Sequence, residues 1–280
     1  MMNTTELIKA GSEILKKNNI SSYSLDSEII LSNILKITRE KLLIYEDKVT
    51  NKIVKKFKKL IIRRSLKEPI AYIIKNKEFM SKSFYVDNKS LIPRPETELL
   101  IEEIIKIYRN KRLFFLDIGA GSGCIMLSIL KNLNKSTGIG IDISKSTLIN
   151  SKKNLKKFKL LNRSKLLHKS INEIRNIKFD LIVSNPPYVV RRDIKRLSND
   201  VKKFEPIIAL DGGNDGLDVI KKVIYKSKYI LKSNGILALE IGKNQYGLVT
   251  KVLEANNFRE KIVIKDYKNN IRCIFSTLLN

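Results

Sequence analysis

The chain has 280 residues, of which 43% are hydrophobic, so it is long enough for one large domain or two modest ones with a substantial core. No stretch approaches the roughly 20 consecutive apolar residues of a membrane span, and residues 1–11 lack the basic segment and apolar run of a secretion signal. The single histidine, His168, and two cysteines, Cys124 and Cys273, exclude a multi-histidine metal site and a disulfide framework. We therefore expect chemistry without a metal in a reduced, cytoplasmic protein.

The charge of the chain is strongly positive, because 55 Lys and Arg residues face only 28 Asp and Glu, for a net charge of +27. Such an excess suits a polyanionic partner such as RNA, DNA or a ribosome-bound protein. It is equally consistent with compositional drift, since the chain is rich in Lys, Ile and Asn and its basic residues are scattered. We expect no membrane partner and no stable nucleic-acid binding, although the charge leaves the latter open.

Residues 1–75 predict a small helical domain without strands. Apolar residues at helical spacing indicate four helices. The first is predicted to be capped by Thr4 or Thr5, the second by Ser24, and the third to follow Thr38. The fourth covers residues 53–61 and carries lysines on its outer side. The region holds no catalytic constellation, so we interpret it as a substrate-recognition domain whose basic faces dock a partner.

Residues 76–95 predict a β-hairpin linker between two domains. Pro69 ends the helical region, since proline disfavours helix in the residue before it. Aromatic and polar residues at 78–86 suit two short strands. Pro93 and Pro95 then stiffen the chain, and the acidic residues after Pro95 suit the first turn of a helix that continues to Tyr108.

Residues 96–280 predict a doubly wound α/β domain with a seven-stranded, Rossmann-like sheet. Apolar runs alternate with helical stretches, and the last two runs are separated by only a short connection that suits a hairpin. The predicted strands cover residues 113–118, 138–143, 165–168, 179–184, 236–241, 260–265 and 271–277.

A glycine-rich turn follows the first of these strands. It comprises Asp117 and then Gly119, Ala120, Gly121, Ser122 and Gly123. Its spacing is not the dinucleotide pattern, and no Lys-Ser or Lys-Thr follows as in a P-loop. Asp142 lies 19 residues beyond Gly123, at the end of the second strand, where a carboxylate can accept both hydroxyls of a ribose. Together these features predict a nucleoside site, which a nicotinamide cofactor would share.

The segment Asn185, Pro186, Pro187, Tyr188 directly follows an apolar strand and is the candidate catalytic segment. In an open α/β sheet, the carboxyl ends of the strands face the ligand crevice. The side-chain carbonyl of Asn185 and the backbone carbonyl of Pro186 can act as paired acceptors for an –NH₂ group, while Tyr188 packs on its flat face. Orientation in a dry pocket then aids a poor nitrogen nucleophile, and no strong base is needed. This chemistry does not distinguish an adenine amino group from a glutamine amide.

The combination of this segment with the glycine-rich turn resembles the amino-methyltransferases that act on exocyclic base nitrogens or glutamine amides. Residues 91–98, Leu-Ile-Pro-Arg-Pro-Glu-Thr-Glu, resemble more closely the peptide chain release factor N5-glutamine methyltransferases. Further matches at residues 68–72, 204–206 and 239–242, and at 266–267 with Arg272, extend this resemblance from about residue 68 to the end of the chain.

The resemblance implies a seven-stranded S-adenosylmethionine-dependent methyltransferase domain preceded by a helical domain and a hairpin. It also implies a substrate, the glutamine of the Gly-Gly-Gln loop in class 1 release factors, contacted by Asn185, Pro186, Pro187 and Tyr188. The residues implied in cofactor binding are Asp117, Gly119, Ala120, Gly121, Ser122, Gly123, Asp142, Ser170 and Asn185.

The chain departs from the family pattern at three places. Lys169 and Ser170 stand where the family carries an acidic and then an aromatic residue at the adenine, so only a backbone contact from Ser170 could survive and we predict weaker cofactor affinity. Lys75 or Asn76 replaces the glycine ahead of the hairpin, which puts that turn in doubt. Asn269 replaces a glycine near the end, where asparagine tolerates a left-handed turn.

Three alternatives to release-factor methylation stay open. A nucleic-acid adenine methyltransferase would use the same segment, but the chain has no sizeable insert to read a sequence or hold a flipped base. Its only long connection, residues 189–215, matches the release-factor family. A sister enzyme could methylate a ribosomal-protein glutamine, and a basic RNA-binding module could retain the site without activity.

Overall fold

The computed structural model describes residues 2–44 and 48–279, and the chain divides into two compact units. The first unit contains residues 1–76 and 198–204, and the second contains residues 77–197 and 205–280. The hairpin expected within residues 76–95 clusters with the second unit.

The first unit is helical, as its periodicity predicts, but Pro69 does not end the helical region, because a further helix begins directly after it. Its helices are α1 (Thr4–Lys17), α2 (Tyr23–Leu35), α3 (Arg39–Leu43), α4 (Asn51–Ser65) and α5 (Ile70–Ile74), with α9 (Asn199–Phe204) from the later segment. Two predicted caps are wrong. Asn3 caps α1, because its side chain accepts from the backbone N–H of Glu6 and the Glu6 carboxylate accepts from the N–H of Asn3. The second helix starts after Ser22, two residues before Ser24, whereas Thr38 caps α3 as predicted.

Close packing and one buried ion pair hold the first unit together. A Cβ atom at Gly11 of α1 would lie 2.6 Å from the ring of Phe57 on α4, so the glycine permits the close approach of these helices. Arg64 lies 2.6 Å from the carboxylate of Asp26, which joins α4 to α2 inside the unit.

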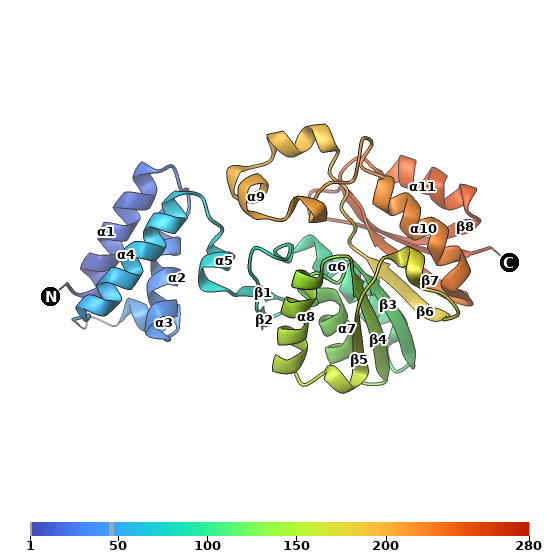
Figure 1. Cartoon of the computed structure of the whole chain (residues 1–280), viewed down its shortest axis with the longest axis horizontal. Coiled ribbons are helices and arrows are strands. Elements are labelled where there is room, and N and C mark those ends of the chain that lie inside the picture. Colours follow the sequence, from blue (N-terminus) through green and yellow to red (C-terminus); the bar gives the residue numbers. More distant parts are fainter. Residues whose placement is uncertain (1, 45–47, 280) are drawn as a thin grey trace. The chain divides into compact units, whose positions relative to one another are not determined.

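The second unit contains the predicted seven-stranded sheet, which confirms the fold class. Its order is β5-β4-β3-β6-β7-β9-β8, with β9 antiparallel to both neighbours (Figure 1). The strands are β3 (Leu113–Ile118), β4 (Ser136–Asp142), β5 (Ser164–His168), β6 (Phe179–Ser184), β7 (Leu231–Glu240), β8 (Phe258–Lys265) and β9 (Ile271–Leu278). The largest error of prediction is in β7, which starts five residues earlier than the apolar run because polar residues occupy its exposed beginning.

Helices cover both faces of this sheet. One face packs against α6 (Glu96–Tyr108), α7 (Cys124–Asn132) and α8 (Lys145–Lys157), and the other against α10 (Asp218–Ile230) and α11 (Tyr246–Ala255) (Figure 1). Alternate residues of a strand serve the two faces, as Phe115 and Leu116 of β3 show. The chain leaves β3 in one direction for β4 and β5 and in the other for β6 and β7, which makes the carboxyl ends of β3 and β6 a topological switch point.

The turns that lack a family glycine adopt the left-handed conformation without one. Lys75, directly after α5, has φ of 55°, and Asn269, between β8 and β9, has φ of 62°. The predicted hairpin forms between β1 (Lys77–Phe79) and β2 (Lys82–Phe84), and Met80 and Ser81 between them have φ of 49° and 54°. The left-handed conformation costs a non-glycine residue roughly 1–3 kcal/mol.

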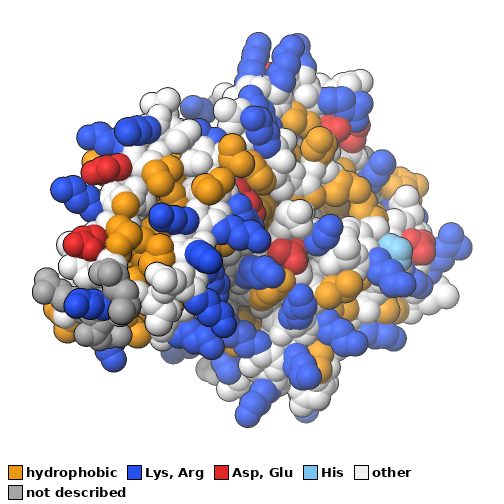
Figure 2. All heavy atoms as spheres, turned by 60° about the vertical axis from the view of Figure 1, so that its left-hand side comes forward, with side chains coloured by type: hydrophobic (Ala, Val, Ile, Leu, Met, Phe, Trp, Pro, Cys, Tyr) orange, Lys and Arg blue, Asp and Glu red, His pale blue; other side chains and the backbone are white. Residues whose placement is uncertain are grey.

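Within the described residues, no helix combines the length and apolarity needed to cross a membrane. Basic side chains are spread over the face shown in Figure 2, with few acidic side chains among them. The positive charge therefore does not single out one binding surface on that face.

Candidate active site

A cavity of about 550 Å³ opens at the carboxyl ends of the central strands. This volume falls within the roughly 300–1,000 Å³ typical of small-molecule sites. The loops after four parallel strands line it, so the topology gathers residues that lie far apart in the sequence. The predicted site residues that line it are Gly119, Gly121, Asp142, Ser170, Asn185 and Pro187.

The glycine-rich turn follows β3 and forms one wall of the cavity. The N–H groups of Gly119 and Ala120 both donate to the carbonyl of Ile141, at 2.9 Å, which anchors the turn to β4. Gly119 and Gly121 have φ of 73° and 57°, and a Cβ atom on Gly119 would meet no protein atom within 4 Å. The turn thus presents bare backbone beside open space, which suits close approach of a ligand.

The other predicted residues of this turn lie behind the wall. Ala120 and Ser122 are buried and do not line the cavity. Gly123 has φ of 81°, and a Cβ atom there would lie 3.3 Å from atoms of Leu127 and Ser151. These residues shape the strand-to-helix turn.

Asp117, the penultimate residue of β3, is fully buried and only half satisfied. Its Oδ2 accepts from the backbone N–H of Met126 in the first turn of α7, at 3.1 Å. Its Oδ1 has no hydrogen-bond partner among the described residues. Burial raises the pKa of Asp117 to about 7. An orphaned carboxylate oxygen beside the glycine turn fits a ligand that brings a cationic or N–H donor.

Asp142 ends β4 and braces two loops. Its Oδ2 accepts from the N–H of Gly121 at 3.0 Å, and its Oδ1 from the N–H of Ser144 at 2.8 Å. An ionised carboxylate offers about four acceptor positions, so two stay available to hydroxyl groups in the cavity. Burial raises the pKa of Asp142, although these N–H groups and nearby His168 favour its charged form.

Ser170 lines the cavity but already uses its backbone donor. Its N–H donates to Oε2 of Glu173 at 2.7 Å, within a capping box that starts the short helix η2 (Ile171–Glu173). The backbone contact expected from Ser170 therefore competes with a local hydrogen bond. Asn172, which the sequence analysis did not select, also lines this end of the cavity.

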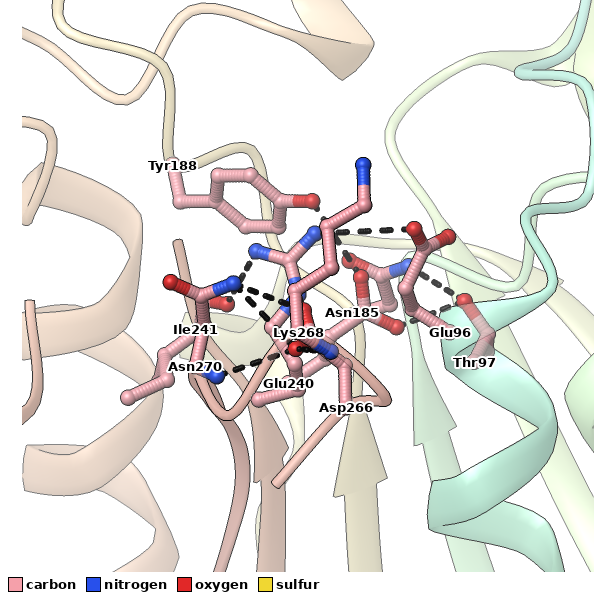
Figure 3. Close-up of polar contacts among 10 residues, drawn as sticks. Glu96, Thr97, Asn185, Tyr188, Glu240, Ile241, Asp266, Lys268 and Asn270 are labelled. Carbon is pink, nitrogen blue, oxygen red and sulfur yellow. Dashed lines mark hydrogen bonds and ion pairs between the residues drawn. The ribbon is translucent and has the colours of Figure 1, made fainter. Parts of the chain in front are cut away.

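The Asn-Pro-Pro-Tyr segment leaves the end of β6 and is held by polar groups from two other elements (Figure 3). The side-chain N–H of Asn185 donates to Oγ1 of Thr97 at 3.0 Å, and the Thr97 hydroxyl donates to Glu240 at 2.6 Å. The hydroxyl of Tyr188 donates to the other oxygen of Glu240, at 3.2 Å. Pro186 is buried, whereas Asn185 and Pro187 reach the cavity.

Glu240 is the last residue of β7 and is fully buried. Burial raises its pKa to about 7, while its hydrogen bonds with Thr97 and Tyr188 and the charge of Arg272 favour ionisation. Burial and the adjacent carboxyl of Glu240 also raise the pKa of Tyr188. Tyr188 is thus a neutral hydrogen-bond donor to this carboxylate.

Three further polar contacts fix the segments around the site. Gln245 donates to the backbone carbonyl of Tyr188 at 3.0 Å. The guanidinium of Arg94 lies 2.5 Å from Glu205, whose other oxygen accepts from the N–H of Ile92 at 3.2 Å. Burial of a carboxylate requires such partners.

Sequence reasoning noted Thr97, Arg94, Glu205 and Glu240 as parts of matching motifs but assigned them no role. One signal was available for Glu240. A glutamate within the apolar run 236–241 of a central strand is costly unless it is paired, so it marks a position with a buried partner.

Comparison with known proteins shows the family of the chain. Residues 6–74 match the family model described as the PrmC N-terminal domain, and residues 95–204 match the methyltransferase small domain. The release factor glutamine methyltransferase of Clostridium acetobutylicum is 39% identical over 277 residues, which cover 96% of each chain. That of Clostridium botulinum is 37% identical over 96% of this chain and 97% of its own. The chain belongs to the family of release factor glutamine methyltransferases.

Membership of this family confirms the resemblance predicted from residues 91–98 and 185–188, and it favours a glutamine methyltransferase over the nucleic-acid alternative. Among solved structures, the hMettl16 catalytic domain is similar with a TM-score of 0.57 and 15% identity, over 70% of this chain and 76% of that one. This likeness concerns the fold of the catalytic unit.

Proposed function

We propose that the chain transfers a methyl group from S-adenosylmethionine to the side-chain amide nitrogen of the glutamine in the Gly-Gly-Gln loop of class 1 release factors, and so modulates translation termination. The observation that carries this proposal is the meeting of two sets of residues in one cavity. Gly119, Gly121 and Asp142 suit a nucleoside, and Asn185 and Pro187 line the same space.

The polar groups of the cavity fit the cofactor. The free acceptor positions of Asp142 suit the ribose hydroxyls. Asp117 is fully buried and does not line the cavity, but its orphaned Oδ1 would suit a cationic amino group. The bare backbone of Gly119 leaves room for close approach. When bound, S-adenosylmethionine supplies an electrophilic methyl group on a sulfonium sulfur. With Ser170 engaged in its capping box, we expect the adenine end to bind less tightly than the ribose end.

The residues at the other end act on the glutamine amide. The side-chain oxygen of Asn185 and the backbone carbonyl of Pro186 accept its two N–H groups, and Tyr188 packs on its planar face. This grip aims the nitrogen at the methyl group, which matters because an amide lone pair is delocalised. The new N–C bond forms as the S–C bond breaks, and the nitrogen then releases a proton to solvent.

We assign recognition of the release factor body to the helical domain, residues 1–75, with residues 76–95 as the linker and 96–280 as the catalytic domain. The basic side chains of α4 give this domain a surface suited to acidic partners. We place the reaction in the cytoplasm, where class 1 release factors act on ribosomes.

The test is methyl transfer from labelled S-adenosylmethionine to three substrates: a class 1 release factor, its variant with the loop glutamine replaced by alanine, and DNA. We expect label on the unaltered release factor alone. We expect no label when the Asn185→Ala variant is used in place of the wild-type enzyme. Label on the glutamine-free variant, or on DNA alone, would contradict the proposed substrate.

A further inference from the structure

A continuous chain of hydrogen bonds joins the two ends of the Asn-Pro-Pro-Tyr segment through Thr97 and Glu240, and the bond between Thr97 and Glu240 is buried. We propose that Thr97 and Glu240 are positioning residues, which fix the Asn185 side chain so that its oxygen, and never its nitrogen, is offered to the substrate –NH₂ group. This inference rests on the proposed function, because it concerns the acceptor that grips the glutamine amide.

The direction of each hydrogen bond follows from the number of hydrogens available. A carboxylate has none to give, so the Thr97 hydroxyl donates its single hydrogen to Glu240. The separation of 2.6 Å is typical of a hydroxyl that donates to a carboxylate. The oxygen of Thr97 can then only accept on its other side, and Asn185 must turn its –NH₂ toward it. The amide oxygen of Asn185 is therefore the atom left for the cavity.

The alternative orientation of Asn185 is disfavoured by repulsion. If the amide were rotated by 180°, its oxygen would face the oxygen of Thr97 at 3.0 Å with no hydrogen between them. The rotated amide would also present N–H donors to a substrate group that consists of N–H donors. The oxygen and the –NH₂ group of an asparagine amide have nearly the same shape, so packing alone does not select between the two orientations. A hydrogen-bond partner that can only accept, here Thr97, selects one of them.

Glu240 sets the direction of the hydrogen bonds in this series, because among its members only an ionised carboxylate has no hydrogen to donate. It does so only while it is ionised. A protonated Glu240 could donate to Thr97, and the Thr97 hydrogen would then be free to turn toward Asn185. The buried position of Glu240 raises its pKa to about 7, so this change falls within an accessible pH range. The charged and titratable groups that face Glu240 are Arg272, Glu96, Tyr188, Cys124 and Cys273.

The same series of hydrogen bonds also links the orientation of the Asn185 side chain to the position of the Tyr188 ring. Because Tyr188 donates to the second oxygen of Glu240, one carboxylate orients both the acceptor of the amide and the ring that we expect to cover its face. Thr97 lies at the start of α6 and Glu240 at the end of β7, both buried, so the device is anchored on regular elements and not on loops.

The test compares Thr97→Val, Thr97→Ser and Glu240→Gln with the wild type. Valine keeps the shape of threonine but removes the acceptor, so kcat should fall about 10- to 100-fold, the change expected when one buried polar group loses its partner. Serine keeps the hydroxyl and should retain activity within about threefold of wild type. The affinity for S-adenosylmethionine should be unchanged in all three. Thr250→Val is the matched control, since that hydroxyl bonds within its own helix, to the carbonyl of Tyr246.

The pH profile separates positioning from mere structural support. Wild-type kcat should fall as the pH drops below about 7, where Glu240 gains a proton. A glutamine at this position can accept from Thr97 at every pH, so the acidic decline should disappear in Glu240→Gln. A decline that persists in this variant, or a Thr97→Val enzyme with wild-type kcat, would overturn the inference.

A second readout does not depend on the substrate. In ¹⁵N-labelled protein, the side-chain –NH₂ signal of Asn185, assigned by its loss in Asn185→Asp, should show slow solvent exchange that Thr97→Val abolishes and Thr97→Ser keeps. If the wild type methylates no release factor, the proposed function is wrong. The exchange rate of the Asn185 –NH₂ group then still tests whether Thr97 and Glu240 fix its orientation. If the wild type is active but the signal is unchanged in Thr97→Val, the positioning chain fails alone.

Discussion

Asp142→Asn should weaken the binding of S-adenosylmethionine. The carboxylate accepts one backbone N–H on each oxygen, from Gly121 at 3.0 Å and from Ser144 at 2.8 Å. An asparagine has only one oxygen, so one of these N–H groups would face an –NH₂ donor. The same replacement removes the acceptor for one ribose hydroxyl.

The magnitude follows from the loss of charge-assisted hydrogen bonds, each worth about 1.5–3 kcal/mol. One such loss raises the Kd for S-adenosylmethionine about 10- to 100-fold. Stability should respond differently. Burial raises the pKa of Asp142 in the folded protein, so the stability that this group contributes is lost as the pH rises through that raised pKa. Replacement by Asn removes this pH-dependent contribution but leaves one backbone N–H beside an –NH₂ donor, so the melting temperature without cofactor should fall.

Isothermal titration calorimetry and thermal unfolding without cofactor are the two measurements. Asp180→Asn is the matched control, because Asp180 also accepts a backbone N–H, from Phe114, but stands at the start of β6, away from the cavity. The control should bind S-adenosylmethionine as the wild type does. A Kd within twofold of wild type for Asp142→Asn, or an equal loss in Asp180→Asn, would refute the reasoning.

Three further outcomes concern stability. Burial raises the pKa of Glu240 from 4.5 to about 7, so its contribution to stability falls as the pH rises across that window, and the melting temperature of Glu240→Gln should depend less on pH between roughly 5 and 8. Gly216→Ala should cost roughly 1–3 kcal/mol, because φ is 77° and the new Cβ would lie 2.6 Å from the backbone oxygen of Tyr188. Arg94→Ala should cost about 3 kcal/mol in urea unfolding, since it removes the guanidinium that pairs with the buried carboxylate of Glu205.

Matched variants decide these outcomes. Gly247→Ala on α11 has no atom within 4 Å of the new Cβ and should be neutral or stabilising by about 0.5–1 kcal/mol. Arg196→Ala breaks only an exposed pair with Asp193 and should cost less than about 1 kcal/mol. If Gly216→Ala matches Gly247→Ala, or Arg94→Ala matches Arg196→Ala, the packing and ion-pair arguments fail. An unaltered pH dependence of the melting temperature in Glu240→Gln would contradict the prediction for Glu240.

The sequence correctly predicted structural features that depend on a few neighbouring residues. The alternation of apolar runs and helical stretches identified the seven strands, because burial on both faces of a parallel sheet requires continuous apolar residues. The left-handed Asn269 follows from the chemistry of a single residue. The glycine-rich turn and the Asn-Pro-Pro-Tyr segment were recognised for the same reason. The predicted cap at Thr4 or Thr5 was wrong, because the side chain of Asn3 accepts from the N–H of Glu6 instead.

The sequence by itself thus determined the fold class, the family and the segments that line the cavity. Only the tertiary structure decided what holds those segments in place. Thr97 and Glu240 are 143 residues apart and Asn185 lies 88 residues from Thr97, yet one hydrogen-bonded chain joins them. Periodicity reports which residues are buried, but not which buried polar groups meet. That pairing depends on strand order and helix packing, because each buried donor and acceptor must find a partner wherever the fold brings one.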